Sequence, residues 1–478
     1  MLTTLRSWWQ DKLLKGVLKN SSYLFSSNTL SAALSMLNSI FVTRLIGLDG
    51  LGLVTTIQTF TSNINRLLSF RMSEVVIKYL GQALTANQAV GEDNTHASES
   101  EINPVTQNLQ AAAIVKGIGL IEAATSLLAY LILMVLAPWA ARLLAKDPSV
   151  AALFPFYGLM LLANLVYETS TGVLQTHKRF DRLAIINTIQ SIITAVLILL
   201  AFFFKYGVVE VLIAYLLGKT FAGIAVAIMA FRQMNLSLGR GWWRISLQQV
   251  KIWRDMMGFA LNTNLNGTVN LITRDNAPLY LAALSPSTLS QGYVGTFKLG
   301  LSIINFITLP IDPFIWPTYA EITRTIALRQ WQRTRSLLKR VSTIAGIWTM
   351  SATAGIALLG WWLIPLVYGP GTLPVYPVVL ILLVGYGTAN ILNWNRPLLL
   401  ALGKPSFPVL VAVVIGAIEI LLTLWFVPQG GYLAMATILA LYLAVSVGII
   451  ARRGWREIRE HEARELVPVE PISKDLSV

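Results

Sequence analysis

The sequence predicts an all-α polytopic membrane protein with twelve transmembrane helices in two six-helix bundles. Of its 478 residues, 55% are hydrophobic and only 13% are charged, and the mean hydropathy is +0.62. A soluble domain carries about 25% charged residues. Apolar runs long enough to cross a bilayer recur along the chain, and the Lys and Arg residues concentrate in alternate connections between these runs. Together these observations exclude a soluble enzyme.

Each predicted span is an apolar run that can cross the ~30 Å hydrocarbon core of a bilayer. The twelve runs cover residues 21–44, 50–78, 110–137, 150–176, 182–204, 208–231, 255–282, 289–319, 338–366, 376–401, 406–427 and 430–451. The first 20 residues are polar and basic, so we predict a cytoplasmic N-terminal segment at 1–20 and no removable signal peptide.

The formal net charge of +14 is distributed unevenly among the connections. Basic residues gather before the first span and after the fourth, sixth, eighth and twelfth, whereas the opposite connections hold little beyond Arg142, Lys146 and Lys205. Cytoplasmic loops are enriched in Lys and Arg, so this asymmetry predicts a multi-pass protein of the cytoplasmic membrane with both termini in the cytoplasm. Topology and contact with anionic lipid therefore explain the basicity, and nucleic acid is not expected as a partner.

The connections also divide the chain into two lobes. We predict an N-lobe at 21–232, which carries spans one to six and a polar cytoplasmic loop at 82–109. A basic and aromatic linker at 233–254 is predicted as an amphipathic interfacial helix in the cytoplasm. The C-lobe at 255–452 carries spans seven to twelve, and a cytoplasmic tail follows at 453–478.

Three short motifs recur in the same order in both halves. "LIGLDGLGLVTTIQTF" (45–60) resembles "LSPSTLSQGYVGTFKLG" (284–300), and "SE" at 73–74 parallels "AE" at 320–321. "LQTHKRF" resembles "LALGKPSF", which places Lys178 opposite Lys404. Matching order and matching sidedness indicate parallel repeats, which are related by an axis along the membrane normal.

The seventh span contains the most polar stretch of any predicted span, "NTNLNGTVNLITRDN" at 262–276. A charge at the bilayer centre costs roughly 2.5–3.5 kcal/mol on insertion scales, so polar stripes inside spans normally face protein or water. Asn262, Asn266, Asn270 and Arg274 recur every fourth residue and share one helix face. We therefore predict that this stripe lines a polar cavity between the two halves.

Other spans carry similar stripes, and these complete the predicted cavity. Its cations are expected to be Arg66, Arg274, Lys298 and Arg396, and its lining is expected to include Asn63, Glu168, Asn266, Asn270, Asp275, Asn305 and Asp312. An alternative stays open for each residue. Arg274 could pair with Asp312 or a neighbour, and the Asn stripes could simply hold helices together through hydrogen bonds.

Several chemistries have no candidate residues in this chain. There is no cysteine, and His96, His177 and His461 all fall in connections, so disulfides, thiol catalysis and a metal site are not expected. The sequence contains no P-loop motif, so direct ATP hydrolysis is not expected. We predict a transporter without catalytic residues or cofactor, and coupling to a monovalent cation or to a proton gradient stays open.

"LIGLDGLGL" after the first span, "RDNAPLYLAALSPSTLSQGYVGTFKL" across spans seven and eight, and "LALGKPSF" after span ten resemble the oligosaccharide (polysaccharide) flippases. These belong to the multidrug/oligosaccharidyl-lipid/polysaccharide exporter superfamily, and the resemblance covers about residues 10–452. It implies two bundles that form a V around a central cavity and alternate between inward and outward openings. It also carries the family pattern onto Asp275, Gly292, Tyr293 and Gly295.

The resemblance implies that an undecaprenyl-diphosphate-linked glycan is flipped across the membrane for envelope or exopolysaccharide synthesis. The membrane bilayer and this lipid-linked oligosaccharide are the implied partners, with other polysaccharide-assembly membrane proteins as further candidates. A cation-coupled multidrug exporter of the same superfamily remains an alternative, although residues 20–48 lack the acidic residue on which such exporters rely. A membrane glycan polymerase is a weaker alternative, because the predicted external loops are short.

Overall fold

A computed structural model describes residues 12–69, 72–92, 104–247 and 253–466. The N-terminal half contains α2 (Lys12–Leu68), α3 (Met72–Glu92), α4 (Pro104–Ala140), η1 (Ala141–Ala145), η2 (Pro148–Ala152), α5 (Leu153–Ala163), α6 (Tyr167–Thr176), α7 (Phe180–Phe203) and α8 (Val208–Leu238). The C-terminal half contains η3 (Trp242–Arg244), α9 (Trp253–Asn270), η5 (Leu271–Asp275), α10 (Ala277–Leu284), α11 (Ser290–Thr308), α12 (Asp312–Ala327), α13 (Trp331–Tyr368), α14 (Val375–Ile391), α15 (Asn395–Ala401) and α16 (Ser406–Leu466). The predicted all-α fold is confirmed, since these ranges contain no strand.

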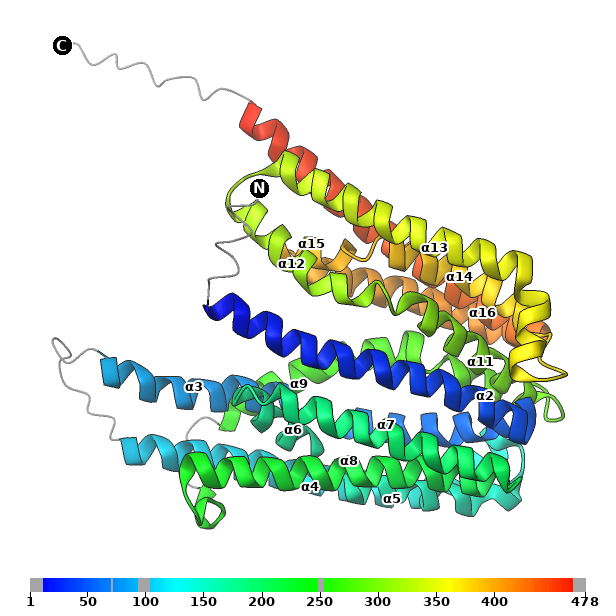
Figure 1. Ribbon diagram of the computed structural model, residues 1–478, viewed down its shortest axis with the longest axis horizontal. Coiled ribbons are helices and arrows are strands. Elements are labelled where there is room, and N and C mark those ends of the chain that lie inside the picture. The colour runs from blue at the N-terminus through cyan, green and yellow to red at the C-terminus, as the bar shows by residue number, and fades with distance from the viewer. Residues whose placement is uncertain (1–11, 70–71, 93–103, 248–252, 467–478) are drawn as a thin grey trace.

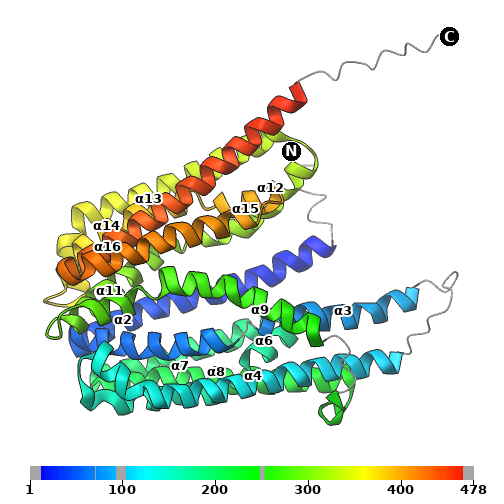
Figure 2. The same cartoon turned by 180° about the vertical axis from the view of Figure 1, so that it is seen from behind.

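Some helices of the structure contain two predicted spans, and other predicted spans are made of two shorter helices. In the described ranges, eight helical stretches are long and apolar enough to cross a membrane. Two of them, Ser26–Leu84 and Ser406–Ala463, hold two spans each, because the chain leaves helical geometry at Gly47 (φ 68°) and Gly431 (φ 53°). Figures 1 and 2 show α2 and α16 doubling back on themselves. The pairs α9–α10 and α11–α12 supply the seventh and eighth spans, whose polar stripes lower their hydropathy.

Two lobes pack together at one end and diverge at the other. Figures 1 and 2 show α2–α8 and α11–α16 side by side at the end where α2 turns, and splayed at the end where α2 begins and α16 ends. The apolar cores agree with this arrangement. One large buried cluster joins residues of both lobes, including Val54, Phe154, Phe297 and Val378. At the splayed end two separate clusters replace it. One surrounds Met72 and also includes Met256 and Ala260 of α9, and the other surrounds Trp394 of the C-lobe. We call the two ends the closed end and the basic end.

Matching spans of the two lobes are interrupted at matching places, which supports the parallel repeat. The fourth and tenth spans each break for three residues, at 164–166 and at 392–394. α6 and α15 then end in the same way, because Arg179 N–H donates to the Leu174 carbonyl and Lys404 N–H donates to the Leu399 carbonyl. The left-handed residue that closes each helix is Lys178 in one lobe and Gly403 in the other. The motif match therefore shifts by one residue, and Lys404 corresponds to Arg179.

The linker differs from the predicted single amphipathic helix. α8 continues through Leu238, Gly239 and Gly241 then adopt left-handed conformations, and the 3-10 turn η3 follows at Trp242–Arg244. Two consecutive breaks of this kind stop helix propagation. Residues 248–252 lie outside the described ranges. The predicted polar loop at 82–109 is partly helical, because α3 runs to Glu92 and α4 begins at Pro104, and its centre at 93–103 is not described.

Candidate substrate site between the two lobes

The predicted site begins with a single carboxylate that bridges both lobes. Asp275 Oδ2 accepts a hydrogen bond of 2.8 Å from Arg66 Nη1 of the N-lobe. Its other oxygen, Oδ1, accepts a hydrogen bond of 3.0 Å from Arg274 Nε of the C-lobe. Next to this triad, the Asn63 amide donates to the side-chain oxygen of Asn276 across the same interface. The structure thus brings Arg66, Arg274, Asp275 and Asn63 together.

Local backbone geometry explains how two consecutive residues reach the same place. The five residues of η5 form a π-helix between α9 and α10. A π-bulge widens the helix by one residue per turn and is frequent at functional sites. Here it ends at Asp275, immediately before the α10 N-terminus at Ala277–Pro278. Pro278 fits there because the first turn of a helix needs no donor from it.

The triad carries excess positive charge. Two arginines share one aspartate, and Lys219 of α8 lies near enough to Arg66 for their charges to repel. Arg274 also lines a pocket of about 150 Å³ together with Arg396, Tyr442 and Ser446. This pocket lies among α9, η5, α15 and α16 of the C-lobe. Arg396 therefore shares a pocket with Arg274, and its part in binding a substrate stays a prediction.

The remaining predicted residues have separate positions. Lys298 is half-buried on α11, and Asn305 and Asp312 are exposed on α11 and α12. None of their side chains forms a hydrogen bond or an ion pair with another described residue, so the suggested Arg274–Asp312 pair does not form. Glu168 lies within the N-lobe, where it accepts a hydrogen bond of 2.5 Å from Ser73 Oγ. The side chains of Asn262, Asn266 and Asn270 lie outside the described residues.

Glu122, which was not among the predicted lining residues, explains the position of Glu168. Its two carboxylate oxygens accept hydrogen bonds from the backbone N–H groups of Glu168 (2.7 Å) and Thr169 (2.8 Å). These N–H groups are free because α6 begins just after the break at 164–166. Glu122 therefore caps a broken helix inside the N-lobe, and its role here is structural.

The closed end is sealed by contacts to backbone carbonyls. Lys146 Nζ donates to the Ala283 carbonyl (2.9 Å), and Gln291 Nε2 donates to the Leu144 carbonyl (2.7 Å). Glycines allow the backbones themselves to touch. A Cβ atom on Gly52 would collide with the Gln291 carbonyl oxygen, and one on Gly295 would collide with the Leu48 carbonyl oxygen. Both glycines lie in motifs that the sequence matched between the halves, and the structure places those motifs against each other.

Glu419 is a further acidic group near the site. It lies on the first half of α16, its side chain is 3% exposed, and neither carboxylate oxygen has a hydrogen-bond partner among the described residues. Tyr386 and Tyr442 lie close enough to feel the charges of both Glu419 and the Arg274–Asp275 pair. Spacing alone did not place Glu419 on a polar stripe, because the residues one helical turn away include a single polar side chain, Thr423.

Comparison with known proteins identifies the family. A family model described as "polysaccharide biosynthesis protein" matches residues 112–375, which is more than half of the chain. The chain belongs to this polysaccharide biosynthesis protein family. Another similar protein, inner membrane protein YghQ of Escherichia coli (strain K12), is 22% identical over 378 residues, covering 78% of this chain and 99% of the relative.

Solved structures show that this family member shares the fold of the MOP superfamily. An inward-facing multidrug resistance MATE family transporter superposes with a TM-score of 0.66 at 14% identity, covering 91% of this chain and 96% of the other. The lipid II flippase MurJ, in an inward closed conformation, gives a TM-score of 0.60 at 14% identity and covers 93% of each chain. The two-lobe fold class is thereby confirmed, and the helical stretches that are long and apolar enough to cross a membrane agree with it.

Proposed function

We propose that this protein is a flippase that moves an undecaprenyl-diphosphate-linked oligosaccharide across the inner membrane by alternating access. The observation that carries this proposal is the Arg66–Asp275–Arg274 triad, which spans the two lobes and carries a net positive charge. A cationic site favours a diphosphate headgroup and disfavours organic cations. Membership of a polysaccharide biosynthesis family supports a glycan on that headgroup.

The triad suggests how binding could be coupled to movement of the lobes. A diphosphate offers oxygens that compete with Asp275 for both guanidinium groups, and each charge-assisted contact contributes roughly 1.5–3 kcal/mol. When the headgroup replaces Asp275 as the partner of Arg66, the ionic link between the lobes is lost. The lobes can then rock while the lipid tail stays in the bilayer.

Lys298 and Arg396 extend the cationic path. Arg396 shares a pocket with Arg274, and Lys298 is eight residues from the start of α11 at the closed end, about 12 Å along the helix. We propose that the headgroup first meets Arg66, Arg274 and Arg396 and passes Lys298 when the closed end opens. Lys298 thus serves the later half of the transport cycle.

The direction of transport rests on orientation. We propose that the basic end faces the cytoplasm, so the described conformation is open inward. The chain has no cysteine, so single cysteines at Ser98, Ser246 and Ser477 can report sidedness, although Ser98 and Ser477 lie outside the described ranges. All three should resist an impermeant thiol reagent in intact cells. Labelling of all three would reverse the orientation.

Glu419 is our candidate for energy coupling. An ionised carboxylate without a partner is costly inside a membrane protein, so Glu419 is suited to take up a proton or a monovalent cation. The tyrosines beside it lie next to the Arg274–Asp275 pair, which would link its charge to the substrate site. Glu419→Gln should abolish the response of glycan export to the pH or sodium gradient while downhill flipping continues. An unchanged response would remove Glu419 from coupling.

The decisive experiment compares cation variants in glycan export. Arg274→Ala and Arg66→Ala should each lower export at least tenfold while the protein inserts and accumulates normally, because a contact of the size given above is lost. Arg274→Lys should keep partial activity if charge alone matters and little if bidentate geometry does. Arg142→Ala is the matched control, because Arg142 is exposed at the closed end and has no ion-pair partner in the described ranges. Wild-type export by Arg274→Ala, Lys298→Ala and Arg66→Ala alike would refute the mechanism.

Cation-coupled multidrug export is the second candidate, and the buried carboxylate of Glu419 is the observation that favours it. A flippase of a diphosphate lipid needs a positively charged triad, whereas an exporter of organic cations needs a negatively charged site. Purified protein should bind polyprenyl diphosphate and lose this binding in Arg274→Ala. Tight binding of organic cations that depends on Glu419, with no affinity for the diphosphate, would favour the exporter.

A further inference from the structure

A second basic pocket lies far from the triad, at the basic end of the C-lobe. It occupies about 880 Å³ between the start of α13 and the part of α16 that extends beyond the last span. Its lining combines six cations with four less polar residues: Arg335, Lys339, Arg452, Arg453, Arg456 and Arg459, with Leu392, Ile449, Ala451 and Trp455. Nothing in the flippase mechanism uses these residues.

The charge in this pocket is only partly neutralised. Glu457 accepts from Lys404 and Arg453, at 2.6 and 2.5 Å, and Glu460 accepts from Arg456 at 2.6 Å. Arg335, Lys339, Arg452 and Arg459 have no acidic partner among the described residues. Cations that line one pocket repel each other unless an anion lies between them. The four cations without acidic partners therefore favour an anionic ligand in this pocket.

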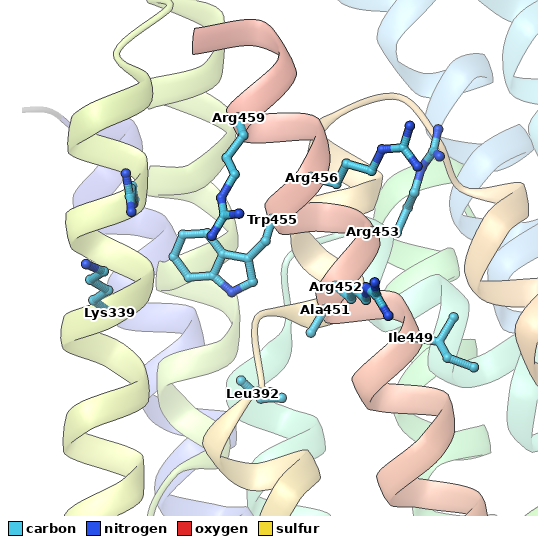
Figure 3. A pocket seen from close by; sticks show the side chains of 10 residues that line it. Lys339, Leu392, Ile449, Ala451, Arg452, Arg453, Trp455, Arg456 and Arg459 are labelled. Carbon is cyan, nitrogen blue, oxygen red and sulfur yellow. The ribbon is translucent and has the colours of Figure 1, made fainter. Parts of the chain in front are cut away.

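The pocket floor is rigid and apolar. Trp455 packs edge-to-face on Trp394, with ring centroids 5.5 Å apart, and Trp394 is 1% exposed and donates to Ser342 Oγ at 2.7 Å. Figure 3 shows Trp455 and the Arg459 guanidinium together on the side of α16 that faces α13, where Lys339 lies. A half-buried Trp beneath a cluster of cations is typical of a membrane–water interface.

An apolar path leads from the membrane surface into the pocket. Leu441, Val445 and Ile449 recur every fourth residue on α16 and are all exposed apolar side chains, and Ile449 lines the pocket. The predicted twelfth span ends at residue 451. From Arg452 to Arg459 the helix rises about 10 Å above that level, which is the depth of lipid headgroups. The acyl chain of a lipid would contact this apolar stripe, whereas a soluble anion would not.

We propose that this pocket binds an anionic phospholipid, with its phosphate among Arg335, Lys339, Arg452 and Arg459 and one acyl chain along the Leu441–Ile449 stripe. The headgroup would neutralise two helix ends that otherwise repel each other. The phosphate chemistry is shared with free phosphate, but the apolar stripe selects the lipid. This site is separate from the triad and takes no part in transport of the glycan.

The test uses the full-length protein in proteoliposomes and bromine quenching of tryptophan fluorescence. Dibrominated phosphatidylglycerol in a phosphatidylcholine background is compared with dibrominated phosphatidylcholine in a phosphatidylglycerol background. The signal of Trp455 is the difference between the wild type and Trp455→Phe, because the chain has 14 tryptophans. We expect Trp455 to be quenched at a mole fraction of brominated phosphatidylglycerol at least tenfold lower than of brominated phosphatidylcholine.

Matched double variants distinguish this site from general surface charge. Arg335→Gln with Arg452→Gln should abolish the preference, because both cations line the pocket and lack acidic partners. Arg333→Gln with Arg340→Gln removes the same charge from the same end of the molecule, outside the pocket lining, and should leave the preference intact. Equal quenching by both lipids, or the same loss in both double variants, would overturn the proposal. Full reversal of phosphatidylglycerol quenching by millimolar inorganic phosphate would also overturn it, in favour of a soluble anion.

Discussion

The closed end and the middle of the lobe interface hold the two halves together by different means. At the closed end, glycines bring backbones into contact, and Lys146 and Gln291 donate to fixed carbonyl groups. In the middle, Arg66 of one lobe meets Asp275 of the other, and both side chains are partly exposed. The first kind of contact depends on shape, and the second depends on charge that another anion can replace.

Under the proposed function, the backbone contacts keep the closed end shut, and the ion pair is the contact that responds to substrate. Backbone contacts are specific but cannot respond to a ligand chemically. An exposed ion pair contributes only about 0.2–1 kcal/mol, so a substrate headgroup can displace it at little cost. We therefore expect substitutions at the closed end to change which conformation forms, and substitutions in the triad to change what the protein binds.

The largest effect is expected at the glycine contacts. Gly52→Ala or Gly295→Ala places a methyl group on a backbone carbonyl that cannot move aside, and overpacking of this kind costs roughly 1–3 kcal/mol. The closed end should open. A cysteine at Ser285, which is 3% exposed there, should then be labelled by an impermeant thiol reagent several-fold faster in intact cells, and glycan export should fall.

Gly346→Ala is the control for this experiment, because a Cβ atom there meets nothing within 4 Å. It should leave both labelling and export unchanged. If Gly52→Ala also leaves the labelling of a cysteine at Ser285 at the wild-type rate, the glycine contacts do not form the seal.

An intermediate effect is expected from Asp275→Asn. The change keeps the shape of the side chain but removes the charge that competes with a phosphate for Arg66 and Arg274. Binding of a polyprenyl diphosphate to the purified protein should become several-fold tighter, whereas export should fall because release is slower. Unchanged or weaker binding in a calorimetric titration would show that Asp275 positions the arginines and does not compete with the ligand.

The smallest effect concerns the basic end, where Glu457 lies outside the spans. Burial of this carboxyl raises its pKa, but the hydrogen bond and charge of Lys404, and the charge of Arg453, outweigh burial and lower the pKa overall. A lowered pKa in the folded state stabilises the protein above the pKa of the unfolded chain, and this contribution is lost as pH falls through the folded value. Glu457→Gln should lower the melting temperature by a few degrees at pH 7 and by less near pH 4. A difference that does not depend on pH would mean that packing, and not charge, holds this residue.

The sequence predicted the all-α fold and its apolar spans well, because an apolar run depends only on residues along one helix. The polar stripe at Asn262, Asn266 and Asn270 lies outside the described side chains and stays a prediction. It could not predict the partner of Arg66, because Asp275 is 209 positions away and the pairing depends on how the lobes approach. The same limit applies to Glu168, whose stripe suggested the cavity but whose partners, Ser73 and Glu122, lie within one lobe.

The helix breaks illustrate the same limit in another way. Pro397, three residues after the break at 392–394, signals an interruption of the tenth span. The break at 164–166 has no proline or glycine, and it is stabilised by the distant carboxylate of Glu122. A turn that is stabilised by a residue of another helix has no signal in its own local sequence. The closed-end glycines were visible as repeated motifs, but their contact with each other was not.

The reversal of α16 at Gly431 has a consequence for membrane insertion. The first half of this helix carries Glu419, and the second half begins directly after Pro428, Gln429 and Gly430. An acidic residue at the centre of a span opposes partitioning into lipid by about 2.5–3.5 kcal/mol. Because the turn is too short to form a separate loop, the two halves enter the bilayer as one hairpin. The span at 430–451 has no charged residue, so its insertion favours entry of the whole hairpin and offsets the cost of Glu419, which a solitary span would bear alone.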